Sequence, residues 1–160
     1  MPHSDLLLEL VKRYSPSTLE APAVQYLVRW MSERGFEAYT DSAGNAFGIR
    51  GATNAPHTLI LLGHIDTFPG DIPVRVEKVT PQGAKTTSQP FSELSAGYTL
   101  YGRGSVDAKG SLCTFAEATA QATIPDGWRV IVAGCVEDEI ASGKGSNYVS
   151  EHFTPDYCII

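Results

Sequence analysis

Hydrophobic residues recur along the N-terminal part of the chain at helical spacing. Residues 5–14, "DLLLELVKRY", place their apolar side chains on one face of a helix. Residues 17–35 repeat this pattern, with Ser17 and Glu20 at capping-box spacing and Gly35 as a C-terminal stop. The sequence therefore predicts two amphipathic helices before any strand.

Short apolar runs follow these helices and predict strands. The predicted strands span residues 36–40, 45–51, 57–64, 74–79, 99–102, 128–136 and 156–160. Further helices are predicted over residues 108–122 and 144–151, and residues 80–98, rich in Pro, Gly, Ser and Thr, are predicted to form a long loop. The runs at 57–64 and 128–136 are almost continuously apolar, as in strands covered on both faces. This alternation predicts an α/β domain whose sheet is covered on both sides.

Composition and charge narrow the class of protein. The chain has 160 residues, 42% of them hydrophobic and 19% charged, with a formal net charge of −6, which is typical of a globular domain. An acidic balance argues against sequence-independent binding to nucleic acid or to an anionic membrane. The longest apolar runs fall far short of the roughly 20 residues of a spanning helix. We therefore expect no nucleic-acid partner and no membrane partner.

The cysteines and the end of the sequence lead to two further predictions. Cys113, Cys135 and Cys158 are widely spaced and form neither a C-x-x-C zinc pattern nor a disulfide framework. They are predicted to be buried thiols in a reducing cytosol. The chain stops at Ile160, inside a predicted strand, so we expect it to be the front part of a longer protein.

Three segments that could carry chemistry each follow or adjoin a predicted strand. In α/β sheets, the edge where parallel strands end is where ligands bind. In the first, "GHIDTFPG" at residues 63–70, His64 and Asp66 are two apart and so face the same point in extended backbone. A neutral imidazole is a good zinc ligand, and a neighbouring carboxylate can orient its ring. By itself, this pair also fits a capping aspartate beside a half-buried histidine in a turn.

The second segment, "YGRGSVDAKG" at residues 101–110, surrounds one acid with glycines. Glycine permits positive φ and close backbone approach, and Asp107 stands at the start of the following helix. Asp107 alone also fits a plain N-cap. Arg103 fits either an anion-binding residue or a buried partner of an acid.

The third segment, "CVEDEIASGKG" at residues 135–145, has three consecutive acids directly after a buried strand: Glu137, Asp138 and Glu139. Such a run is usually found in a solvated loop. Next to His64 and Asp107, these acids would raise one another's pKa values unless a cation balanced them. One histidine with several carboxylates is a ligand set that suits zinc.

Together, "GHIDTFPG", "LYGRGSVDAKG" and "EDEIASGKG" resemble the dinuclear zinc amidohydrolases and peptidases of the aminoacylase, carboxypeptidase G and succinyl-diaminopimelate desuccinylase family. "DSAGNAFGIRG" and "LLGHIDTFPGDIPVRVE" look most like its acetyl-ornithine/acetyl-lysine deacetylase branch, which includes the hydrolase that releases lysine or ornithine from an amino-group carrier protein. The resemblance covers residues 14–160. It implies a three-layer sandwich with a mixed, mostly parallel sheet and helices on both faces.

The resemblance also implies roles. His64 would ligate one zinc ion, and Asp66 would hold the His64 ring or assist the metal site. Asp107 would bridge two zinc ions, often with a cis peptide to the next residue. Counting back six residues from Gly145 gives Glu139 as a zinc ligand and Asp138 as the catalytic base, although the family base is normally glutamate. The shifted register, with Glu137 as base and Asp138 as ligand, restores the glutamate but breaks the spacing.

The implied function is zinc-dependent hydrolysis of a linear amide, with cobalt as a substitute metal. The substrate would be an N-acyl-lysine or N-acyl-ornithine of lysine or arginine biosynthesis, either as a small molecule or on an acylated carrier protein, in a cytoplasmic enzyme. Residues 1–160 would be the N-terminal portion of the catalytic domain. The remaining ligands and a dimerisation domain would lie beyond residue 160, and the full-length protein would be a homodimer.

Two alternatives remain open. One is a related hydrolase, such as a succinyl-diaminopimelate desuccinylase, a dipeptidase or a carboxypeptidase. The other is a non-catalytic relative that acts as a binding module, for which the aspartate at position 138 and the early stop argue.

Overall fold

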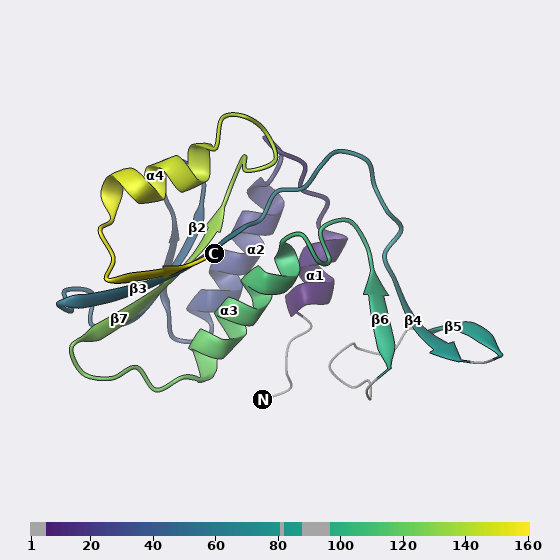
Figure 1. Cartoon of the computed structure of the whole chain (residues 1–160), viewed down its shortest axis with the longest axis horizontal. Coiled ribbons are helices and arrows are strands. Elements are labelled where there is room, and N and C mark those ends of the chain that lie inside the picture. The colour runs from purple at the N-terminus through teal and green to yellow at the C-terminus, as the bar shows by residue number, and fades with distance from the viewer. Residues whose placement is uncertain (1–5, 81, 88–96) are drawn as a thin grey trace.

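The fold is built around a five-stranded mixed sheet with helices on both of its faces (Figure 1). It is seen in a computed structural model that describes residues 6–80, 82–87 and 97–160. The sheet order is β1-β2-β7-β3-β8. Its strands are β1 (Glu37–Thr40), β2 (Ala46–Gly51), β3 (His57–His64), β7 (Trp128–Cys135) and β8 (Tyr157–Ile159). The α/β class and the mixed sheet are as predicted.

Strand direction divides the sheet into halves. Within the described residues, β1–β2 and β2–β7 pair antiparallel, whereas β7–β3 and β3–β8 pair parallel. In the central parallel pair, His64 at the end of β3 lies opposite Cys135 at the end of β7. The two most apolar strands therefore end side by side, at one edge of the sheet.

Successive residues of β3 and β7 lie on opposite faces of the sheet and pack in two separate cores. Leu61 and Val132 pack in a core with α1 (Leu6–Lys12), α2 (Ala21–Ser32) and α3 (Lys109–Gln121). Ile60 and Ile131 pack in a second core with Phe47 of β2 and Val149 of α4 (Lys144–His152). This alternation follows from the two-residue period of strands, and it explains why both strands are apolar throughout. In Figure 1, α4 lies on the opposite side of the sheet from α2 and α3.

A second, smaller sheet has the order β5-β4-β6. It comprises β4 (Arg75–Thr80), β5 (Gly83–Thr87) and β6 (Tyr98–Tyr101). The predicted loop at 80–98 is wrong for residues 83–87, because these polar residues pair with β4 and are stabilised by that ladder rather than by burial. Residues 81 and 88–96 of that loop, and Asp5 at the predicted start of the first helix, lie outside the described residues.

Two further expectations are corrected. The capping box is wrong: α2 begins at Ala21, its N-cap Glu20 makes no side-chain capping bond, and the Ser17 hydroxyl donates to Asp66 instead. Cys113 and Cys135 are buried free thiols as predicted, but Cys158 is exposed because it lies on the edge strand β8. In the part of the chain that the structure describes, no helix has the length and apolarity to cross a bilayer.

Candidate metal centre

The three acid-bearing segments converge at the edge where β3 and β7 end. His64 is the last residue of β3, and the acid turn, residues 136–139, follows β7 directly. The glycine turn, residues 102–107, brings the chain to α3, which packs against both strands through Leu112. The topology thus brings together segments that are far apart in the sequence.

His64, Asp107 and Glu139 form a compact cluster of metal-ligand types. Each offers one ligand atom, and these atoms all lie within 4.8 Å of one another. The Nε2 atom of His64 is 3.0 Å from Oδ1 of Asp107. Asp107 is 78% exposed at its side chain and the peptide bond from Asp107 to Ala108 is cis. The structure therefore places the three residues predicted as ligands around one point that solvent reaches.

Asp66 orients the His64 ring. The Nδ1 atom of His64 lies 3.0 Å from the main-chain oxygen of Asp66 and 3.5 Å from its Oδ1. The Nδ1–H donates to the main-chain oxygen of Asp66, with the charged Oδ1 close by, and this fixes the ring so that Nε2 faces Asp107. The Asp66 carboxylate, followed by Asp107, raises the pKa of His64 to about 9 against the opposing effect of burial.

Asp66 is fully buried beneath the cluster and contributes no ligand atom to it. Its Oδ2 accepts hydrogen bonds from the Ser17 hydroxyl at 2.7 Å and from the Glu139 N–H at 3.0 Å. Burial acts to raise the pKa of Asp66, but the contacts with His64, Glu139 and Ser17 outweigh it and lower the pKa to about 2. Asp66 is therefore an ionised carboxylate that supports both a ligand and the acid turn.

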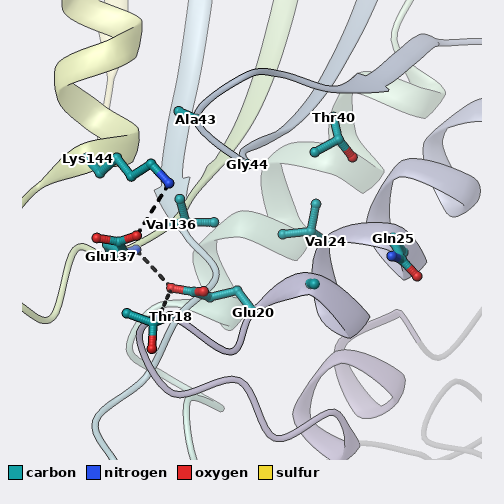
Figure 2. A pocket seen from close by; sticks show the side chains of 11 residues that line it. Thr18, Glu20, Val24, Gln25, Thr40, Ala43, Gly44, Val136, Glu137 and Lys144 are labelled. Carbon is teal, nitrogen blue, oxygen red and sulfur yellow. Dashed lines mark hydrogen bonds and ion pairs between the residues drawn. The ribbon is translucent and has the colours of Figure 1, made fainter.

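The three consecutive acids point in different directions. The Glu137 carboxylate accepts from the Ser142 hydroxyl at 2.8 Å and contributes no atom to the cluster. It lies 3.5 Å from Nζ of Lys144 (Figure 2). Asp138 is exposed and contributes no atom to the cluster. Of these three acids, Glu139 is the one that lies in the cluster with His64 and Asp107.

The donor set of this cluster fits a divalent metal ion. Desolvation, followed by the charge of Asp107, raises the pKa of Glu139, which is the expected strain of two carboxylates placed together without a cation. One imidazole nitrogen with carboxylate oxygens is a borderline ligand set that zinc accepts.

A cavity of about 400 Å³ opens beside the cluster. Its lining includes Asp107 and Glu139 together with Thr67, Phe68 and Arg103. The Nε atom of Arg103 donates to the main-chain oxygen of Gly70 at 2.8 Å, and no carboxylate among the described residues forms an ion pair with it. Of the two interpretations of Arg103, the buried partner of an acid is therefore not seen in the described part of the chain.

Several residues that support the site have no chemical signature in the sequence. The Oδ1 atom of buried Asn45 accepts the Val136 N–H at 3.0 Å, and its Nδ2 donates to the Gly145 oxygen at 3.1 Å. Buried Lys109 donates to the main-chain oxygens of Leu10 and Arg13 at the end of α1, and burial lowers its pKa to about 8. Both are polar residues between apolar runs, so only their partners in three dimensions reveal them.

Comparison with known proteins identifies the family. The family model "Peptidase family M20/M25/M40" matches residues 60–160, and the chain belongs to this family. The LysW-lysine hydrolase of Deinococcus radiodurans is 42% identical over 159 residues, covering 98% of this chain and 38% of that protein. Succinyl-diaminopimelate desuccinylase 2 of a Ruegeria species is 31% identical, covering 91% of this chain and 35% of that protein. The chain thus spans less than two fifths of the length of these relatives.

Solved structures confirm the fold. An aminopeptidase from the archaeon Desulfurococcus kamchatkensis matches with a TM-score of 0.65 at 15% identity, over 96% of this chain and 61% of that one. A tripeptidase from Staphylococcus aureus matches with a TM-score of 0.61 at 18% identity, over 96% of this chain and 41% of that one. At such identities the likeness concerns architecture alone.

Proposed function

We propose that this chain supplies the front part of the active site of a zinc-dependent amidohydrolase that releases a free amine from a linear amide. The observation that carries the proposal is the convergence of His64, Asp107 and Glu139, from three separate segments, to within 4.8 Å at the end of two parallel strands. Membership of the M20/M25/M40 family supports the same chemistry.

The residues take the following roles in this proposal. His64 (through Nε2), Asp107 and Glu139 would hold the zinc, with Asp107 shared between two ions. Zinc held there would lower the pKa of a bound water to about 7 and would polarise the amide carbonyl. Asp66 fixes the tautomer and the orientation of His64. Asp138 accepts the proton of the attacking water and returns it to the leaving amine. Cobalt, with similar ligand preferences, would substitute for zinc.

The substrate in this proposal is an acyl-lysine or acyl-ornithine, either as a free small molecule or linked to a carrier protein. The name of the Deinococcus relative, LysW-lysine hydrolase, supports the carrier-linked form. The name of the Ruegeria relative supports an amide of a diamino acid more generally. The cavity that contains Arg103 offers a guanidinium group for a carboxylate of either substrate.

The remainder of the site belongs, in this proposal, to sequence beyond these 160 residues. Coverage of 38% of the Deinococcus relative leaves room for the rest of the catalytic domain and for a dimerisation domain. The full-length protein is then a cytoplasmic homodimer, and the 160-residue chain alone binds zinc weakly and does not turn over substrate.

The test is zinc content and turnover of the full-length protein and of the 160-residue chain. N-acetyl-ornithine, N-acetyl-lysine and carrier-linked lysine are the substrates to compare. We expect two zinc ions and turnover of at least one substrate in the full-length protein. Stoichiometric zinc without turnover of any amide would favour a binding module, and absence of zinc binding would contradict the metal centre.

A further inference from the structure

Two residues of the described chain other than glycine have left-handed backbone. Thr18 has φ of 76° and Glu137 has φ of 57°. Residues with a Cβ rarely adopt this region, and a β-branched residue such as threonine does so least readily. Such backbone persists only where surrounding contacts enforce it, and it gathers at functional sites. Glu137 lies in the acid turn, two residues before the proposed ligand Glu139.

One carboxylate oxygen connects these two residues. The Oε1 atom of Glu20 accepts the N–H of Thr18 at 2.9 Å and the N–H of Glu137 at 3.1 Å. Figure 2 shows the Glu20 side chain between the two segments, with both bonds drawn. Glu20 is only 6% exposed, so few water molecules are available to replace this acceptor.

Glu20 belongs to a segment that holds both sides of the metal centre. In this segment, which we name the brace (residues 15–20, "SPSTLE"), the Ser15 hydroxyl donates to the Ile65 oxygen at 2.8 Å, and the Ser15 oxygen accepts the Thr67 N–H at 2.9 Å. The Ser17 hydroxyl donates to the same Asp66 oxygen that accepts the Glu139 N–H. The brace thus contacts the residues after β3 at one end and the acid turn at the other.

An ordinary helix cap does not account for these contacts. Glu20 occupies the N-cap position of α2, but its side chain makes no capping bond to that helix. Its carboxylate is directed instead to a turn that follows β7. The first turn of α2 therefore lacks a side-chain cap from Glu20. The Glu20 carboxylate instead accepts the Glu137 N–H, at the proposed active site.

We infer that Glu20 and Ser17 are positioning residues of the metal centre, which hold the acid turn so that Glu139 reaches His64 and Asp107. The inference rests on the proposed function, because it assumes that the cluster binds zinc. Groups that orient metal ligands typically contribute 10- to 100-fold to metal affinity. The same orientation sets where Asp138 stands, since Asp138 lies between the two anchored N–H groups of Glu137 and Glu139.

The experiment compares two substitutions of one residue in the full-length protein. Glu20→Met keeps the length of the side chain and removes the acceptor, whereas Glu20→Gln keeps a carbonyl oxygen that can accept both N–H groups. We expect zinc affinity, measured by competition with a chromophoric chelator, to fall about 10- to 100-fold in Glu20→Met and to stay within a few-fold of wild type in Glu20→Gln. Glu33→Met, at the exposed end of the same helix, is the control and should leave affinity unchanged.

A second readout separates positioning from stability. Amide hydrogen exchange over residues 136–140 should become faster in Glu20→Met, because the Glu137 N–H loses its acceptor. Adding Thr18→Gly to Glu20→Met removes the left-handed cost at position 18. We expect this pair to recover part of the urea midpoint while zinc affinity stays low, since the acid turn is still unanchored.

The possible outcomes are distinct. Unchanged zinc affinity in Glu20→Met, or an affinity that recovers in step with the urea midpoint when Thr18→Gly is added, overturns the inference. If Glu20→Met does not fold, Ser17→Ala carries the test: about a tenfold loss of zinc affinity supports the inference and no loss overturns it. If the wild-type protein binds no zinc, the proposed function and the inference both fail. The wild-type protein alone shows this, so it is distinct from a failure of the inference, which only the variants show.

Discussion

The acid turn and the glycine turn each deliver one carboxylate to the same point, but they are held there by different means. The acid turn is held by side chains from elsewhere: Glu20 accepts the N–H of Glu137, Asp66 that of Glu139, and Asn45 that of Val136. The glycine turn is held mainly by its own backbone. In it, the Ser105 N–H donates to the Gly102 oxygen at 3.2 Å, and the Lys109 N–H donates to the Gly104 oxygen at 3.1 Å.

This difference determines which substitutions disrupt each turn. A turn held by remote carboxylates and amides is sensitive to substitutions far away in the sequence. A turn held by its own backbone is sensitive to any Cβ that its conformation does not accept. The four predictions that follow test the residues that the two turns carry and the contacts that hold them, from the largest expected effect to the smallest.

The largest effect is expected from the carboxylate at the end of the glycine turn. In the full-length protein, Asp107→Ala should remove both zinc ions, because one carboxylate serves both in the proposed site. His64→Ala should remove mainly one. Metal analysis of the two purified variants by mass spectrometry checks this, and equal losses would count against Asp107 as the bridge.

In the acid turn, Asp138→Asn should lower kcat by about 10²- to 10⁴-fold while the zinc content stays at the wild-type value. Asp138→Glu should keep or raise kcat. An aspartate carboxylate is one C–C bond, roughly 1.5 Å, shorter than that of glutamate, and a misplacement of about 1 Å can cost on the order of 100-fold. Steady-state kinetics with metal analysis provide the test. Loss of zinc in Asp138→Asn would instead favour the register in which Asp138 is the ligand.

A smaller effect is expected where a remote amide supports the acid turn. Asn45→Ala should lower the free energy of unfolding by about 2–3 kcal/mol, because it leaves the buried Val136 N–H and the Gly145 oxygen without partners. Urea denaturation measures this effect. Asn147→Ala is the matched control, since Asn147 is exposed and should change stability by no more than about 0.5 kcal/mol. Equal effects of the two substitutions would show that the Asn45 network contributes little.

The glycine turn should respond to a single methyl group. Gly104 has φ of 78°, and a Cβ there would stand 2.6 Å from Cγ2 of Thr67. Gly104→Ala should therefore cost about 1–2 kcal/mol from the left-handed backbone alone, read as a lower urea midpoint. Gly83→Ala, also at positive φ but with nothing within 4 Å, gives the backbone cost without the clash. A Gly104→Ala variant no less stable than Gly83→Ala would argue against close packing at Thr67.

Local pattern was enough to predict most of the architecture and to single out the acid-bearing segments, whereas the choice of Glu139 among three consecutive acids came from the family resemblance. The apolar runs of β3 and β7 reflect burial on two faces, and His64, Asp107 and Glu139 have side chains whose chemistry is visible without a structure. The capping-box prediction for Ser17 and Glu20 is wrong because that spacing describes only local contacts, whereas their partners are Asp66, Glu137 and Thr18. The strand β5 has no apolar pattern for a related reason, since its polar residues are stabilised by pairing with β4.

The strand order also sets the order in which this protein can fold during synthesis. β7 lies between β2 and β3 in the sheet, yet it ends about 71 residues after β3. At 5–20 residues per second, a ribosome needs roughly 4–14 s to make that stretch. Throughout this interval the nascent chain carries two apolar strands without their common neighbour. The centre of the sheet and the candidate metal centre therefore form late and together. Until then, the unpaired strand edges are sites where chaperones can bind or nascent chains can associate.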